Sequence, residues 1–424
     1  NQMAVASVRM FTIEETDKYA GSRGDVARMA SNFAGVSFAN DSRNDIVIRG
    51  NTPAGLLWRL EGVDIPNPNH FAMEGTTGGP VGMLNNNTLN NSDFITGAFP
   101  SEYGNALSGV FDLQLRSGNS DEYEFLGQVG FNGFELGAEG PLNFGDGSSF
   151  LANYRYSTLD IMDKIGMDLG AGGIPRYQDF SGKVVVPMKH GRIDGFLLWG
   201  DSEIAILDSN DPEQDFYSQQ GQDLYNGSTA AAGGFSYTRF HNKNASSKLT
   251  LSGTYQKGGT DIYRLEEDER LHELDDNYID YKSSVDYLFA KRFSSKLSSE
   301  SGFSIDRLGL DLDGRVYDFD DKEFLHYFQN SRSLADGPTF SQFYSSWRFR
   351  PSNELTVKAG VNASYFDLNK ENAIDPRLGV SYDLSNRQSF SIAYGMHSKV
   401  QSLVAHYFIN ASPNEDAQET NFDL

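Results

Sequence analysis

Residues 388–397 read QSFSIAYGMH, and this stretch indicates most clearly how the chain folds. Phe390, Ile392, Tyr394 and Met396 alternate with small or polar residues, so one face of the segment is apolar and the other is polar. A period of two sustained over such a length predicts a β-strand whose two faces meet different surroundings.

The same alternation recurs upstream, at residues 249–255, 355–365 and 378–384. The chain from about residue 121 onward is therefore predicted to be a succession of antiparallel strands. A soluble β-sandwich alternates in the same way, so periodicity alone leaves a sandwich and a barrel open.

Composition favours the barrel. Aromatic residues make up 13% of the 424 residues although the hydrophobic share is only 38%, and there are 43 glycines. Transmembrane β-barrels have this composition, because only one face of each strand meets lipid and aromatic residues gather at the two interfaces.

Composition also excludes several classes of protein. With 58 acidic and 35 basic residues the formal net charge is -23, which repels phosphate backbones, so no nucleic-acid partner is expected. No apolar run approaches the roughly 18 to 20 residues of a membrane-spanning helix. The absence of cysteine removes disulfides, thiolate metal sites and cysteine nucleophiles.

Motifs for catalysis are missing as well. The seven histidines are scattered, no nucleophile elbow occurs, and the glycine-rich residues 75–82 (GTTGGPVG) lack the Lys-Ser/Thr pair of a phosphate-binding loop. We therefore predict that the protein is not an enzyme and has no cofactor.

Connection lengths favour the barrel over the sandwich. Outer-membrane barrels alternate short turns on one side with longer loops on the other. With short bends at residues 132–133 and 367–372 placed on the longer side, the pattern gives about 13 strands. The odd count and the polar residues 411–424 predict that the chain stops in a loop before a barrel would close. Short turns are predicted at residues 143–148, 189–192, 241–246, 293–296, 351–353 and 385–387, and longer connections at 160–176, 208–227, 263–277 and 312–336.

The first 120 residues have a different pattern. A short helix is predicted after Ser22, with apolar positions from Val26 to Phe33 and a capping Gly35. An unusually long polar loop follows at residues 66–92. We predict a small mixed α+β domain at residues 1–120 and barrel strands at residues 121–424. The strands expected in the first domain are residues 45–49, 56–65, 93–99 and 110–116.

Two segments of this first domain, residues 44–65 and 93–118, resemble the plug domain of TonB-dependent outer-membrane receptors. In that family an Arg-Gly strand end, an acidic-Gly-Val turn and a later Tyr-Gly…Gly-Val segment follow one another. Residues 374–384 (IDPRLGVSYDL) resemble a recurrent barrel segment of the same receptors. The matching plug positions are Arg49, Gly50, Glu61, Gly62, Val63, Asp64, Tyr103, Gly104, Gly109 and Val110.

The resemblance implies a mostly β fold: a transmembrane antiparallel β-barrel of about 22 strands, with the α+β plug in its lumen. It implies a receptor in the Gram-negative outer membrane that imports a scarce solute, driven by the TonB–ExbB–ExbD system and surrounded by outer-membrane lipids. The likeness is greatest to the Bacteroidetes branch, where a surface lipoprotein is a further partner. An iron chelate, a glycan and a peptide all stay open as the solute.

Departures from the family pattern leave alternatives. Residues 94–100 read FITGAFP, with Thr96 where the family has Arg, and no TonB-binding box is found in residues 1–15. A non-transporting structural or scaffold subunit with the receptor fold is the first alternative. A soluble β-sandwich adhesin with a small α+β domain is the second.

Candidate site residues follow from the plug interpretation. Plug arginines are expected to pair with carboxylates on the barrel wall, because charge-assisted bonds hold a plug by contacts that water can replace. The plug arginines are Arg49, Arg59 and Arg116, and the barrel carboxylates are Glu135, Glu139 and Glu300, with Asp286 and Asp383 as further candidates.

A solute is expected to meet the long plug loop, where Asn67, Asn69, His70 and Phe71 offer polar and aromatic groups. A loop that only packs against the barrel wall is the alternative. The acidic residues 208–215, 266–276 and 311–323 are interpreted as outer loops. They suit either Ca²⁺ or solvent, and because no EF-hand spacing is present we predict no metal site.

Overall fold

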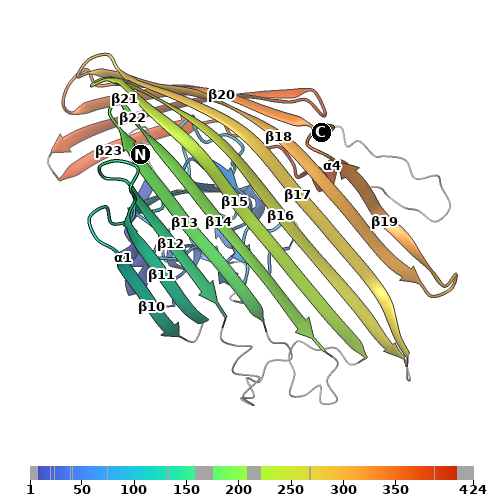
Figure 1. The fold of residues 1–424 in the computed structure, drawn as a ribbon. Helices are drawn as coiled ribbons and strands as arrows, with labels where there is room; N and C mark the ends of the chain where they lie inside the picture. Colours follow the sequence, from blue (N-terminus) through green and yellow to red (C-terminus); the bar gives the residue numbers. More distant parts are fainter. Residues whose placement is uncertain are drawn as a thin grey trace.

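The computed structural model describes residues 8–407, apart from residues 20, 23, 39, 41, 74, 131–132, 158–174, 208–220, 267–268 and 386. The described residues form one large sheet of 14 strands and a smaller N-terminal unit of residues 8–118 (Figure 1). No helix in this part of the chain is long and apolar enough to cross a membrane.

Thirteen strands of the large sheet follow one another in chain order, each antiparallel to the next, and the remaining strand, β19, also pairs with β18. The predicted number of about 13 strands is therefore confirmed. The strands are β10 (Glu124–Gly130), β11 (Gly133–Pro141), β12 (Ser149–Tyr156), β13 (Arg176–Met188), β14 (Gly191–Ile206), β15 (Gln222–Asn242), β16 (Ala245–Glu266), β17 (Glu269–Arg292), β18 (Leu297–Asp318), β19 (Glu323–Arg332), β20 (Thr339–Phe349), β21 (Leu355–Phe366), β22 (Glu371–Ser385) and β23 (Gln388–Gly395).

The sheet curves around the N-terminal unit, which lies on its concave side (Figure 1). Residues at alternate positions face this unit, and we call their side inward; Lys248, for example, donates to the carbonyl oxygen of Glu61. Positions between them face outward and carry many apolar side chains, of which Phe235 and Phe390 are 72% and 62% exposed. Within the described residues no second protein layer covers this outward face, so the sandwich alternative is wrong.

All six predicted short turns lie at one end of the sheet, which we call the short-turn end. The other end, where β15 to β18 extend furthest, we call the long-strand end. Of the predicted longer connections, residues 160–176 and 208–227 lie mostly outside the described residues. The acidic residues 208–215 lie outside them entirely.

Two predicted loops are strands instead. β16 runs to Glu266 and β17 begins at Glu269, so residues 263–277 form a hairpin. Residues 312–336 are likewise mostly the strand pair β18–β19. Charged residues are frequent in both segments and interrupt the apolar alternation that a sequence pattern detects. Cross-strand partners hold them in place: Arg264–Glu273 at 2.5 Å, His272–Asp261 at 2.9 Å, and Arg315–Asp275.

The N-terminal unit contains a five-stranded sheet in the order β1-β8-β9-β4-β5, which places β1 at an edge. Its apolar core contains stacked aromatic rings. The ring centroid of Phe111 lies 4.4 Å from those of both Trp58 and Phe94. The elements are β1 (Val8–Phe11), α1 (Ile13–Lys18), α2 (Val26–Ala30), β2 (Val36–Phe38), β3 (Ile46–Ile48), η1 (Pro53–Gly55), β4 (Leu56–Leu60), β5 (Val63–Ile65), β6 (Asn69–His70), β7 (Val81–Gly82), β8 (Ser92–Ile95) and β9 (Gly109–Leu113); a last helix, α4 (Leu403–Tyr407), follows the large sheet.

The sequence predicts most of these elements with shifted boundaries. The expected helix is α2, but its N-cap is Asp25, whose carboxylate accepts from two backbone N–H groups, rather than Ser22. The segment 56–65 is two strands, because Glu61 and Gly62 have φ angles of 55° and 87° and form a tight turn. The helix α1 and the strands β1 and β2 were not predicted, since their apolar residues show no sustained period.

Candidate functional site

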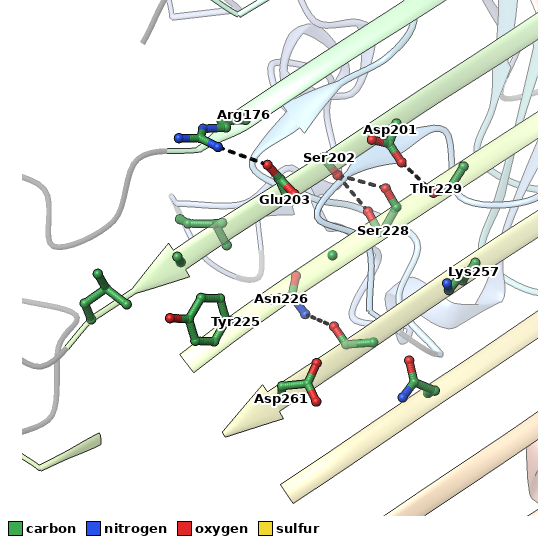
Figure 2. A pocket seen from close by; sticks show the side chains of 16 residues that line it. Arg176, Asp201, Ser202, Glu203, Tyr225, Asn226, Ser228, Thr229, Lys257 and Asp261 are labelled. Atoms are coloured by element: carbon green, nitrogen blue, oxygen red, sulfur yellow. Dashed lines mark hydrogen bonds and ion pairs between the residues drawn. The ribbon is translucent and has the colours of Figure 1, made fainter. Parts of the chain in front are cut away.

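The interface between the N-terminal unit and the inward face of the sheet gathers most of the candidate residues. The loop of residues 66–84 lies at its centre, and two of its backbone N–H groups donate to serines of β14 and β15. Phe71 donates to Ser202 Oγ at 2.9 Å and Ala72 to Ser228 Oγ at 3.2 Å. The two serines also bond to each other at 2.9 Å, as Figure 2 shows.

The four residues predicted to meet a solute, Asn67, Asn69, His70 and Phe71, are all buried. Asn67 donates to the carbonyl oxygen of Gly78 at 2.9 Å, and Asn69 donates to Asn67 at 2.6 Å. These bonds fix the shape of the loop. A role in solute binding stays a prediction.

His70 anchors this loop to the barrel wall. Its Nε2 lies 2.9 Å from Asp179 Oδ2, and the same carboxylate oxygen accepts from Arg155 at 2.6 Å. Arg155 also donates to the carbonyl oxygen of Gly82, closing a network between the loop and strands β12 and β13. Burial lowers the pKa of His70, although its hydrogen bond to Asp179 opposes that shift.

A second contact surrounds the Glu61–Gly62 turn of the plug-like motif. Lys183 donates to Glu61 Oε1 at 2.8 Å and also to the carbonyl oxygen of Leu115. Lys248 donates to the carbonyl oxygen of Glu61 at 3.0 Å, and Lys282 donates to that of Asp64 at 2.9 Å. Three inward lysines from three barrel strands therefore donate hydrogen bonds to the β4–β5 hairpin of the N-terminal unit.

A third contact surrounds residues 99–104. Arg377 of β22 donates to the carbonyl oxygens of Phe99, at 3.1 Å, and Tyr103, at 2.9 Å, and also to that of Pro100. Asn362 of β21 donates to the carbonyl oxygen of Ser101 at 2.9 Å. A side chain at Gly104 would collide with Gln342 and Asn362, so this motif glycine permits the close approach.

The predicted arginine–carboxylate pairs are present only in part. Arg116 forms two 2.6 Å hydrogen bonds to Glu139, and the backbone N–H of Asn119 donates to the same carboxylate. Glu135 instead accepts from the amides of Asn87 and Asn153, each at 2.7 Å.

Arg59 is a correction to the prediction. It pairs at 2.7 Å with Asp64 of its own unit, because the register of β4 with β5 places these two residues opposite each other. Arg49 has a φ of 52° and lies against Gly35 and Gly97 of its own unit. Glu300 lies among arginines on the inward face, away from any plug arginine.

The sequence reasoning missed the barrel's cations, which are the more numerous donors across this interface. The four cations are at inward positions of the strands β13, β16, β17 and β22. They are Lys183, Lys248, Lys282 and Arg377. A basic residue on the polar face of a predicted barrel strand was the available signal. The predicted pairs instead took their cations from the N-terminal unit and their carboxylates from the barrel.

One group of side chains has the composition of a metal site. Ligand atoms of Asp261, His272 and Asp275 lie within 4.8 Å of one another. Arg315 donates to Asp275, however, and His272 already bonds to Asp261. A cation bound here would have to displace both partners.

A hollow of 710 Å³ lies beside this group, between the ends of β13 to β17 (Figure 2). The register places Arg176, Glu203, Asp201 and Lys257 on the outward face, opposite in direction to Ser202. Arg176 pairs with Glu203 at 3.3 Å, and Thr229 donates to Asp201 at 2.7 Å. The hollow therefore faces away from the interface with the N-terminal unit.

Comparisons with known proteins bear on the fold. No family model and no curated protein matches the sequence. Many solved structures match the chain, and three of them are aligned with 93 to 96% of it. They are the ferric enterobactin receptor of Pseudomonas aeruginosa in complex with BCV-L6 (13% identity, TM-score 0.65, 95% of this chain and 64% of that chain), the outer membrane transporter YddB of Escherichia coli (12%, 0.65, 93% and 61%) and the siderophore receptor PirA of Pseudomonas aeruginosa (13%, 0.63, 96% and 64%).

The chain thus spans less than two thirds of the length of these neighbours. They are receptors and transporters of the outer membrane rather than enzymes. At such low identity the likeness establishes the fold: part of a transmembrane antiparallel β-barrel of the kind found in TonB-dependent receptors.

Proposed function

We propose that residues 1–120 are the plug and residues 121–424 the leading part of the barrel of an energy-coupled importer in the Gram-negative outer membrane. The observation that carries this proposal is the interface itself. Barrel lysines and arginines bind the backbone carbonyl groups and Glu61 of the N-terminal unit, so the unit is seated chiefly by polar bonds.

Polar seating suits a part that must move. Water can replace hydrogen bonds to carbonyl oxygens at small net cost, about 0.5 to 1.5 kcal/mol each. A barrel of about 22 strands leaves a wide lumen, which needs a stopper while no solute is passing. A plug held in this way closes the lumen and is still released by a moderate force.

The position of β1 supports a pulling mechanism. It is an edge strand that pairs only with β8 among the described strands, through residues Val8–Phe11 against Ser92–Ile95. In this proposal the TonB–ExbB–ExbD system pulls on chain preceding β1 and peels it from β8. The short-turn end of the sheet then faces the periplasm, and the long-strand end faces the exterior of the cell.

The solute follows less directly. The solved neighbours include receptors for ferric enterobactin and for siderophores, and those ligands belong to those proteins. For this chain we extend the proposal only to a solute too scarce or too large for diffusion pores. The Bacteroidetes type and the surface-lipoprotein partner stay predictions from the sequence.

The test uses the absence of cysteine, which lets a single introduced thiol report alone. Ser92 is 3% exposed and pairs with Phe11 of β1, so Ser92→Cys should be shielded while β1 is in place. In cells producing the full-length protein, labelling of this thiol by a membrane-impermeant maleimide should rise several-fold when the membrane is energised. A protonophore should abolish the rise.

Ser352→Cys is the matched control, because it lies in an exposed short turn and should label equally in both states. Equal labelling of Ser92→Cys with and without energy would contradict the importer and favour the non-transporting scaffold. The readout needs no knowledge of the solute.

A further inference from the structure

A second hollow, of 800 Å³, opens at the short-turn end of the sheet. Its lining is strongly basic although the chain as a whole carries a net charge of -23. Glu300 is its only acidic lining residue. The basic lining residues are Lys243, Lys291, Arg292, Arg348, Arg350 and Lys358.

The register shows which of these cations face inward. Arg292 is paired with Ser298, Ser298 with Arg348, and Arg348 with Lys358, on the strands β17, β18, β20 and β21. Directly paired residues point to the same side of a sheet. Ser346 of the same face is paired with Gly360, which lies against Ser101 of the N-terminal unit, so the row faces the lumen.

The row brings like charges together. Arg348 and Lys358 are direct cross-strand partners, an arrangement that is destabilising when nothing lies between the charges. Arg292 completes the row two strands away, so three cations span about 15 Å at one height of the wall. Such a row is stable when an anion bridges its members.

The arginines of this hollow donate to neutral oxygens, and Glu300 is the acidic group that acts on Arg348. Arg348 donates to Ser298 Oγ at 3.2 Å, Arg350 to Thr356 Oγ1 at 3.3 Å, and Arg292 to the carbonyl oxygen of Ser294 at 3.4 Å. In the described part of the chain these three guanidinium groups form no ion pair. The partners are neutral oxygens at the long end of hydrogen-bond distances.

We propose that this hollow is a binding site for a multivalent oxyanion, with carboxylate or phosphate groups that bridge Arg292, Arg348 and Lys358. Guanidinium groups bind these planar or tetrahedral oxyanions through paired N–H donors. The inward direction of the row excludes a membrane lipid, so the ligand is a dissolved solute. Only the name of this end, periplasmic, rests on the proposed function; the site itself does not.

Pyrophosphate is a suitable probe, and its binding to the purified full-length protein is measured by calorimetry at low ionic strength, where surface screening is weak. We expect binding by the unaltered protein and a loss of at least tenfold in affinity in the double variant Arg348→Gln/Lys358→Gln. Glu300→Gln removes the one opposing charge and should tighten binding several-fold. Lys291→Gln is the matched control, because Lys291 lines the same hollow from the outward face and lies over the ring of Phe293.

Loss of folding is checked by thermal melting without pyrophosphate, where the double variant should melt within a few degrees of the unaltered protein, because it removes both a repulsion and the attraction of two cations to Glu300. No binding by the unaltered protein, or an equal loss in Lys291→Gln, overturns the proposal. Pyrophosphate binding without energy-dependent labelling at Ser92→Cys sustains this site and rejects the importer. Labelling without pyrophosphate binding does the reverse.

Discussion

At the scale of single residues, Arg377 shows how the two parts of the molecule are joined. One side chain from β22 donates to the carbonyl oxygens of Phe99, Pro100 and Tyr103, and that of Pro100 also accepts the backbone N–H of Tyr103. Both Arg377 and these atoms are largely removed from water. Buried acceptors without donors are costly, so this residue carries more of the interface than its size suggests.

We expect Arg377→Gln to destabilise the seating of residues 97–105 by about 2 to 3 kcal/mol, because several buried carbonyl oxygens lose their donor. Hydrogen exchange in those residues should accelerate by roughly 30- to 100-fold, by the relation between free energy and opening. Arg387→Gln, an exposed change at the next short turn, is the control and should leave exchange unaltered. Unchanged exchange in Arg377→Gln would show that the carbonyl contacts are dispensable.

His70 gives the contact with the barrel a dependence on pH. Burial lowers its pKa, so folded His70 stays neutral where an unfolded histidine, with a pKa of about 6.5, binds a proton. The contribution of neutral His70 to folding stability is therefore fully present above about pH 6.5. It decreases below that pH, by at most about 1.4 kcal/mol per pH unit. Asp179, Arg155 and Asp201 are the charged groups that act on it.

Hydrogen exchange of residues 66–84, corrected for its intrinsic pH dependence, should therefore accelerate between pH 7 and pH 5. In His70→Gln the acceleration should be much smaller, because the variant lacks the titrating ring. If both proteins respond alike, other groups control the loop.

Sequence reasoning reached this scale only in part. It expected Arg116 and Glu139 at the interface, but it gave His70 to a solute, with packing against the barrel wall as the alternative, and it gave Arg59 a partner on the barrel. A sequence does not show that Asp64 folds back opposite Arg59 through a turn with positive φ angles. Partner choice depends on register, and register appears only in three dimensions.

At the scale of elements, the outward faces of the barrel strands are divided by height. Leu197, Phe235 and Leu251 are neighbours in an apolar zone on β14, β15 and β16. Nearer the long-strand end, the same faces carry Asp201, Lys257 and other charged residues. The change from apolar to charged residues along each strand therefore indicates the height at which the hydrocarbon layer ends.

We expect Phe235→Arg to cost about 2 to 4 kcal/mol in the folding of the full-length protein into lipid vesicles, as for charged residues near the midplane of other barrels. Urea titration measures this cost. Asn277→Arg is the control, because its outward position on β17 is level with Gly259 and lies beyond the apolar zone, where the cost should be below about 1 kcal/mol. Equal costs would place hydrocarbon over both positions.

The elements themselves were predicted well where one face meets hydrocarbon and the other does not. They were missed at residues 263–277 and 312–336, where frequent charged residues interrupt the period of two in polarity. There, pairs such as Arg264–Glu273 specify the hairpin, and such pairs are not readable before the register is known.

At the scale of the whole molecule, charge is distributed unevenly along the barrel. Acidic residues concentrate in the hairpins of the long-strand end, and a basic hollow occupies the short-turn end. The sequence predicted the fold class and the number of strands, because both follow from local alternation and connection length. The basic hollow was not predicted, since it combines residues from six strands that extend over more than 100 residues of the chain.

The strands also differ in length around the wall. β10 has 7 residues, whereas β17 has 24, although about 9 to 11 are enough to cross a bilayer. The wall formed by the strands is consequently short at β10 and longest at β16 to β18 (Figure 1). In the importer proposed above, a solute therefore meets an entrance of unequal height, with the most open approach to the N-terminal unit, among the described strands, over β10.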